Sequence, residues 1–233
     1  MRRLVLVLVA SLALVPTIAP AHTATGTSGF YRIRWVDADG AIPWRFTMGF
    51  PFDTWDDRVW DGERAWNNVQ RARFHTAYCN DQSSCADYTN YDYSMCPATY
   101  QKNGVHWADI PDPGRVYFCS VDSNGDHRLD QLWSVNMVID SAFPSGTTWY
   151  RGTGAPAASQ VDLWSVVAAE WGHVVGSNFN GDGGGHFLES DPICPTYDTS
   201  SYRRQTMCPH VYKGRIEART PEAHDIHTFD AAY

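Results

Sequence analysis

Residues 161–186, VDLWSVVAAEWGHVVGSNFNGDGGGH, constrain the fold of this chain more than any other stretch. Apolar side chains occupy nearly every side of the first half, which predicts a helix buried inside the protein, and Gly176 is suited to end it. Ser159 and Asp162 have the spacing of a capping box, with Asp in place of the usual Glu, at the expected start of the helix. Two ionisable residues, Glu170 and His173, lie within the apolar part of this helix. Their burial is costly unless each has a partner, so their presence requires a reason.

Two explanations fit the polar residues of this helix. Glu170 and His173 are three residues apart and share a helix face, so they could form a buried hydrogen-bonded pair. Alternatively, they are part of a metal site of the HExxH type, in which two His at positions i and i+4 bind zinc and Glu polarises a bound water. The pentapeptide is AEWGH, so Ala169 replaces the first His. The pentapeptide alone favours the buried pair.

The N-terminus has the pattern of a secretory signal peptide. Two Arg residues precede an apolar run at 4–14, which is too short to span a bilayer, and Ala19-Pro20-Ala21 fits a cleavage site. We therefore expect a signal peptide at 1–21 and a secreted, extracellular mature chain that begins at His22. An uncleaved membrane anchor is the less favoured alternative.

The mature chain of about 212 residues is long enough for a single domain with its own core. Removal of two Arg residues with the signal leaves 16 basic against 26 acidic residues, which is a formal net charge of −10. This charge argues against nucleic acid or an anionic membrane surface as the partner.

The cysteine count indicates disulfides. All of the cysteines lie in the mature chain, and an even number after a secretory signal is typical of a disulfide framework. No CxxC zinc knuckle is present, and six cysteines allow 15 connectivities. Closeness in sequence favours a Cys194–Cys208 bond and pairing among the others, which are Cys79, Cys85, Cys96 and Cys119.

The rest of the chain alternates between patterned segments and loops. Aromatic, β-branched and alternating residues predict strands at 44–50, 73–78, 115–121 and 132–139. Helical spacing of apolar residues predicts a helix at 55–69, and Thr220-Pro221 starts a second one that runs to Tyr233. Long loops are expected at 84–112 and 145–158.

Residues 122–127, DSNGDH, alternate oxygen-bearing side chains as a calcium loop does. His127 replaces the required Gly, and Trp133 stands where an EF-hand has its bidentate Glu. Because Asn124-Gly125 is also a strong hairpin turn signal, a plain hairpin is favoured and bound calcium is the weaker alternative.

The order of these parts resembles the metzincin zinc endopeptidases, and specifically their matrixin-like branch. The residues that carry the resemblance are Glu170, His173 and Gly176 in the helix, Met207 within TMCP, and the C-terminal RTPEAHDIHTFDAAY. It covers roughly residues 31–233. It implies an α+β, zincin-like fold, in which a twisted, mostly parallel sheet packs on the active-site helix. The upper subdomain would span about 30–176, and a small lower subdomain about 177–233.

The resemblance also implies roles for single residues. Glu170 would be the general base, His173 a zinc ligand, Met207 the floor beneath the metal, and Pro209 part of the substrate-pocket wall. Ala169 cannot bind metal, and Phe179 stands where the third ligand is expected. His186 follows a Gly-rich loop short enough to return to the helix end, so it is the candidate substitute ligand, ahead of Asp182.

Three functions follow as hypotheses. The first is a secreted zinc metalloendopeptidase that hydrolyses peptide bonds, with activity attenuated by the loss of one ligand. The second is an inactive pseudoprotease that binds peptide or protein in the retained cleft. The third is a disulfide-stabilised exported domain without a cleft function.

Overall fold

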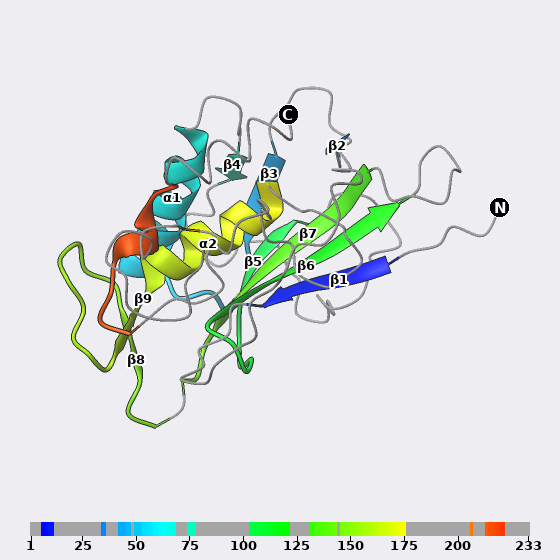
Figure 1. Ribbon diagram of the computed structural model, residues 1–233. Coiled ribbons are helices and arrows are strands. Elements are labelled where there is room, and N and C mark those ends of the chain that lie inside the picture. Colours follow the sequence, from blue (N-terminus) through cyan, green and yellow to red (C-terminus); the bar gives the residue numbers. More distant parts are fainter. Residues whose placement is uncertain are drawn as a thin grey trace, which may run out of the picture.

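The computed structural model describes residues 6–11, 34–35, 42–47, 49–68, 74–77, 103–121, 131–143, 145–175, 206 and 213–221. Within these ranges the chain is an α+β protein with a mixed sheet (Figure 1). The elements, in chain order, are β1 (Leu6–Ser11), β2 (Arg34–Trp35), β3 (Ile42–Phe46), α1 (Thr54–Asn67), β4 (Phe74–Ala77), β5 (Gly104–Ala108), β6 (Gly114–Val121), β7 (Gln131–Asp140), β8 (Thr148–Tyr150), β9 (Gln160–Asp162), α2 (Leu163–Val175) and the 3-10 turn η1 (Glu217–Arg219).

The main sheet has the strand order β1-β6-β7-β5-β3-β4, and β2 pairs with the beginning of β7. The strands β4, β3, β5 and β7 run parallel to one another, whereas β6 is antiparallel to β7 and β1 is antiparallel to β6. The short strands β8 and β9 form a separate parallel pair directly before α2. The sheet therefore changes from parallel to antiparallel at β7.

Both helices pack on the same face of this sheet, as Figure 1 shows. Trp44 of β3 contacts Trp171 of α2, with 4.4 Å between ring centroids. The helices themselves are joined by two indole hydrogen bonds, from Trp66 Nε1 to the Ala168 carbonyl (2.7 Å) and from Trp171 Nε1 to the Val59 carbonyl (3.3 Å). Gly62 of α1 lies at this contact, where a Cβ would come within 3.0 Å of the Ala168 backbone nitrogen. The core is thus aromatic and closely packed around α2.

The structure confirms the predicted helices over α1 and α2 and the predicted strands over β4, β6 and β7. The strand predicted at 44–50 is present as β3, but it ends earlier. After Thr47 the chain turns, because the Phe50 N–H donates to the Thr47 carbonyl and Gly49 adopts a φ of 88°. The positive φ at this turn is why the extended pattern stops before the apolar residues do.

Three other expectations were wrong. Strand β5 lies inside the segment 84–112, and strand β8 lies inside 145–158, both of which were expected to be loops. These strands are short and pair with distant partners, so no local pattern marks them. The capping box is also wrong, because α2 begins at Leu163 and Asp162 is itself the N-cap. Its Oδ2 accepts the Ser165 N–H at 3.0 Å and the Ser165 hydroxyl at 2.7 Å.

The apolar run of the expected signal peptide forms β1, which pairs with β6 from Leu6 opposite Ser120 to Ser11 opposite Arg115. If the chain is cleaved after Ala21, as the sequence predicts, β1 leaves with the signal peptide. Strand β6 then becomes the edge of the sheet and presents unpaired backbone N–H and C=O groups. In the described ranges, no helix is both long enough and apolar enough to cross a bilayer.

The sheet face opposite the helices holds a buried polar pair. His106 of β5 is 6% exposed, and its Nε2 lies 2.9 Å from Asn136 Oδ1 of β7. Burial lowers the pKa of His106 to about 4, because the charged imidazolium is poorly solvated there. The neutral ring is therefore the form that the folded protein accommodates.

This low pKa predicts acid-sensitive stability. The unfolded chain binds a proton at His106 near pH 6.5, whereas the folded chain does so only near pH 4. The contribution of His106 to stability is thus complete above pH 6.5 and is lost as the pH falls toward 4, by about 3 kcal/mol in total. Denaturant unfolding of wild type and His106→Gln between pH 4 and 7 measures it. The stability difference between the two proteins should change with pH, and a constant difference would contradict the prediction.

Candidate functional site

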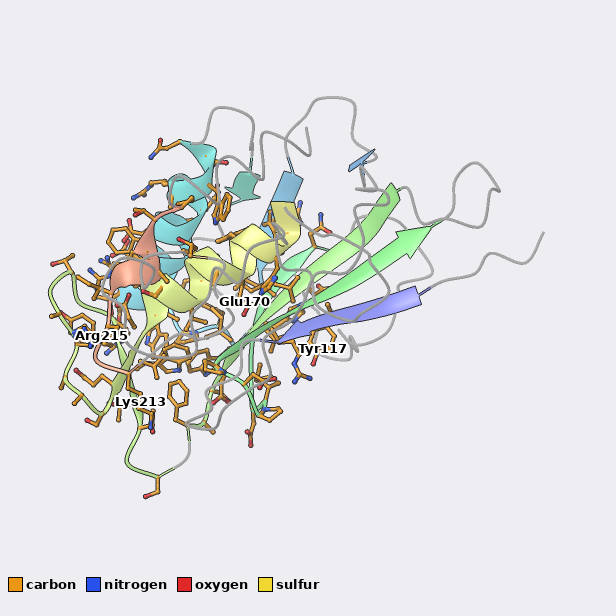
Figure 2. The ribbon with its side chains drawn as sticks, viewed as in Figure 1. Tyr117, Glu170, Lys213 and Arg215 are labelled. Atoms are coloured by element: carbon orange, nitrogen blue, oxygen red, sulfur yellow. The ribbon has the colours of Figure 1, made fainter. Side chains whose placement is uncertain are left out.

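Helix α2 carries the candidate site, and the apolar sequence around it explains its position in the core. Glu170 is 0% exposed and His173 is 1% exposed, so both polar residues are buried as the sequence predicts. Figure 2 shows Glu170 where α2 passes over the sheet. Its side chain lies against the first residue of β6, because a Cβ built on Gly114 would be 3.0 Å from both Cγ and Oε1 of Glu170.

The two carboxyl oxygens of Glu170 have no hydrogen-bond partner among the described residues. A direct hydrogen bond between Glu170 and His173, which is the simpler explanation of this pair, is therefore not formed. A buried polar group left in this state costs about 1–3 kcal/mol, and more when it is charged. Such a group is a mark of a site that completes its bonding with something else.

The electrostatic surroundings of Glu170 favour its neutral form. Burial raises the pKa of the Glu170 carboxyl well above its usual range, and the nearby negative charge of Asp112 raises it further, while Arg115 acts in the opposite direction. Asp112 and Arg115 form an ion pair with each other at the start of β6. A positive charge placed beside Glu170 would restore the carboxylate.

Ala169 stands at the first ligand position of the HExxH pattern, and its surroundings are apolar. It is 0% exposed and belongs to a cluster with Val161 and Val166, against which Phe143 and Trp149 pack. Because positions 169 and 173 are one helical turn apart, the apolar cluster at Ala169 and the imidazole of His173 lie on the same side of α2. The described side chains next to this position thus supply packing and no metal ligand.

A zinc ion fits this helix in one respect, namely the donor chemistry of a buried carboxyl with no hydrogen-bond partner among the described residues and an imidazole one turn further on. Within the described ranges, no group of three or more His, Cys, Asp or Glu side chains is arranged to hold a metal. His186, the expected substitute for the third ligand, and Met207 and Pro209 lie outside the described residues, as does the segment 122–127, for which the sequence favours a plain hairpin over a calcium loop. So do the cysteines Cys79, Cys85, Cys96, Cys194 and Cys208, while Cys119 lies in β6.

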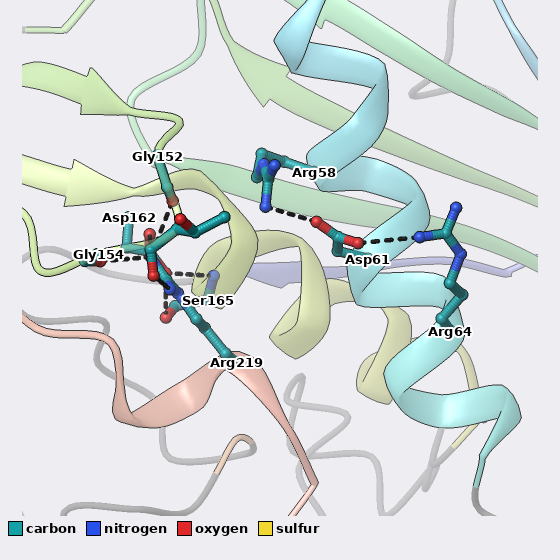
Figure 3. Close-up of polar contacts among 9 residues, drawn as sticks. Arg58, Asp61, Arg64, Gly152, Gly154, Asp162, Ser165 and Arg219 are labelled. Atoms are coloured by element: carbon teal, nitrogen blue, oxygen red, sulfur yellow. Dashed lines mark hydrogen bonds and ion pairs between the residues drawn. The ribbon is translucent and has the colours of Figure 1, made fainter.

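Thr206 contacts the residue that follows η1. Thr206 is 0% exposed, and its hydroxyl donates to the Thr220 carbonyl at 2.6 Å. The neighbouring Arg219, in η1, donates from Nε to Asp162 Oδ2 (2.8 Å) and from Nη2 to Asp162 Oδ1 (2.7 Å). Figure 3 shows this bidentate pair at the N-cap of α2. Two parts of the chain that are 57 residues apart therefore meet at the start of the helix.

Arg219 has further contacts that complete this anchor. Its guanidinium donates to the carbonyls of residues 152, 153 and 154, and it lies over the Trp164 ring with 4.9 Å to the ring centroid. Sequence analysis missed Arg219, Asp162 as its partner, and Gly114. A pair so distant in sequence has no local signature, and a glycine at the beginning of a strand is too common to be a signal.

Comparisons with known proteins add little to this site. No protein-family model matches the chain, and no solved structure matches it. A stretch of 54 residues is 39% identical to 3-phosphoshikimate 1-carboxyvinyltransferase from Roseiflexus sp. (strain RS-1). That stretch is 23% of this chain and 12% of the length of that enzyme, which is too small a part to indicate a shared fold or activity. The resemblance to the matrixin-like family rests on the sequence motifs.

Proposed function

We propose that this protein is a secreted, zinc-dependent metalloendopeptidase of the matrixin-like type, with activity attenuated by Ala169, and that it hydrolyses peptide bonds outside the cell. The observation that carries the proposal is Glu170, a fully buried carboxyl without a described partner, placed three residues before a buried His173 on a core helix. A mostly parallel sheet packed on that helix is what the resemblance implies, and the pairing of β4, β3, β5 and β7 supports it.

In this proposal His173 and His186 would hold the zinc ion, and Glu170 would transfer the proton. The ion would supply Lewis-acid polarisation of the scissile carbonyl and an acidified water. A Glu170 oxygen takes the proton from the attacking water and delivers it to the leaving amine. This role needs the ionised carboxylate, so the raised pKa of Glu170 makes its activity depend on a neighbouring positive charge.

Strand β6 is the proposed binding surface for the peptide substrate. The antiparallel pairing of β1 along β6 supports this, because it places a six-residue extended segment on that edge. The first residue of β6, Gly114, is also the residue next to Glu170. An extended peptide added to this edge would therefore run toward the carboxyl that acts on it.

Loss of the Glu170 carboxylate tests the enzyme. We expect Glu170→Gln to lower casein cleavage by the purified, zinc-supplemented protein by about 100-fold or more, since general acid–base groups contribute on this scale. The matched control is Glu63→Gln, the same chemical change at another buried Glu, on α1, which should leave cleavage within about twofold of wild type. Absence of cleavage by wild type, or equal cleavage by the Glu170→Gln protein, would refute the enzymatic proposal.

A second candidate is a pseudoprotease that binds peptide or protein without cleaving it. The apolar cluster around Ala169 favours it, because the side chains packed at this position fill the place of a zinc ligand. A protein without a complete zinc site could bind a peptide but not hydrolyse it. An extended peptide that binds wild type and Glu170→Gln equally well, and is recovered intact from both, would identify this function.

A further inference from the structure

We propose that Gly114 is a positioning residue for Glu170, in that the absence of a side chain at the start of β6 forms the space that holds the Glu170 carboxyl. Only the role of the Glu170 carboxyl as a general base rests on the proposed function. The contact itself is a feature of the fold. Nothing in the sequence around Gly114 indicates it, because its contact partner is on a helix far along the chain.

The space at Gly114 is fully taken by neighbouring side chains. A Cβ at this position would lie 2.7 Å from Val166 Cγ1, 3.0 Å from Glu170 Cγ and 3.0 Å from Glu170 Oε1. The distance to Val166 Cγ1 is shorter than real Cβ contacts show, so one of these two groups would have to move. The two Glu170 atoms are in tight contact and would have to give way by a few tenths of an ångström. Val166 and Glu170 are one turn apart on α2, so together they press the helix against the glycine backbone.

The backbone conformation does not explain the glycine. Among the described glycines, positive φ angles occur at Gly49, Gly146 and Gly214, and Gly114 is not among them. Glycine in a strand also carries an entropic cost and packs poorly, so another residue would serve better if there were room. The reason for glycine at position 114 is therefore the close approach of Glu170 and Val166.

Two properties of the site follow from this arrangement. The carboxyl is held against backbone on the sheet side, which fixes its direction with no hydrogen bond to a described residue. Strand β6 also becomes coupled to Glu170, since any shift of its first residue moves the surface on which the carboxyl rests. A peptide that shifts β6 when it binds would thus also change the position of the Glu170 carboxyl.

A double-mutant cycle on the full-length protein, read by melting temperature without metal or substrate, tests the contact. Gly114→Ala is made in wild type and in Glu170→Ala, which lacks the two Glu170 atoms that the new methyl would meet and keeps the contact with Val166. We expect Gly114→Ala to lower the melting temperature more in wild type than in the Glu170→Ala background. An equal decrease in the two backgrounds would overturn the proposal.

Gly62→Ala is the matched control for this cycle. Its Cβ would also press on α2, at 2.9 Å from Val167 Cγ1 and 3.0 Å from the Ala168 nitrogen, and no Glu170 atom is among the three atoms nearest to it. Its effect should be the same in both backgrounds. If Gly114→Ala does not fold, the cycle is repeated with Val166→Ala throughout, which removes the shortest of the three contacts.

A second measurement separates positioning from general destabilisation. In protein labelled with ¹³C at Glu carboxyls, the Glu170 signal is identified by its absence in Glu170→Ala. We expect that signal to shift in Gly114→Ala and to stay in place in Gly62→Ala; an unshifted signal in Gly114→Ala would overturn the proposal.

The two proposals can fail separately. A non-additive effect of Gly114→Ala and Glu170→Ala on the melting temperature, in a protein that neither binds zinc nor cleaves peptide, would refute the proposed function alone. Cleavage that depends on Glu170, without coupling to Gly114, would refute the positioning role alone.

Discussion

Replacement of Arg219 by alanine is expected to destabilise the folded protein by about 3–5 kcal/mol, since this is the scale for removing one partner of a buried ion pair. Asp162 is 0% exposed, and the substitution would leave its carboxylate buried without the bidentate guanidinium. Three backbone carbonyls of residues 152–154 would lose their donor as well. Chemical denaturation of both proteins at neutral pH provides the measurement.

Arg64→Ala is the control for this prediction. Arg64 also pairs with an Asp, at 3.1 Å from Asp61 Oδ1, but its side chain is 65% exposed. A surface pair of this kind contributes at most about 1 kcal/mol. If the Arg219→Ala protein is no less stable than the Arg64→Ala protein, the Arg219–Asp162 pair does not make the large contribution to the free energy of unfolding that we predict.

The second large effect is expected from Ala169→His, which restores the first ligand of the HExxH pattern. A His at this position would lie one turn before His173 on the same side of α2. An added ligand is expected to strengthen zinc binding by about 3 kcal/mol, roughly a hundredfold, and to raise peptide cleavage with it. Zinc titration and casein cleavage of wild type and Ala169→His measure both effects.

The apolar cluster around Ala169 opposes this gain. An imidazole there must find room among Val161, Val166 and the rings that pack on them, at a cost of about 1–3 kcal/mol in stability. Ala65→His, a His of the same kind on α1, controls for non-specific zinc binding. A folded Ala169→His protein that binds zinc no better than Ala65→His would show that His173 and His186 do not converge on one metal.

Local pattern made both helices and part of the sheet predictable. The crowding of apolar residues marks α2, the helical spacing marks α1, and alternating or aromatic runs mark β4, β6 and β7. Strand β5 was not predictable, because GVHWA is short and becomes a strand through parallel pairing with β3 and β7. The N-cap was predicted at Ser159 rather than at Asp162 for a related reason. Asp162 is held by Ser165 and by Arg219, and only Ser165 is nearby in sequence.

The candidate site was predictable at α2 and not beyond it. Glu170 and His173 stand out because polar residues in an apolar helix are exceptional. The features that surround Glu170, namely the bare backbone of Gly114 and the Asp112–Arg115 pair, come from another element. Their relation to the helix depends on how α2 packs on β6, which no spacing along the chain reveals.

The zinc content of the folded protein tests the central claim most directly. The measurement is the number of zinc ions per protein molecule after equilibration at a fixed free zinc concentration and removal of unbound metal, for wild type and for His173→Ala. The metallopeptidase account predicts one zinc ion on wild type and its loss from folded His173→Ala. No zinc on wild type, or equal zinc on both proteins, would contradict it.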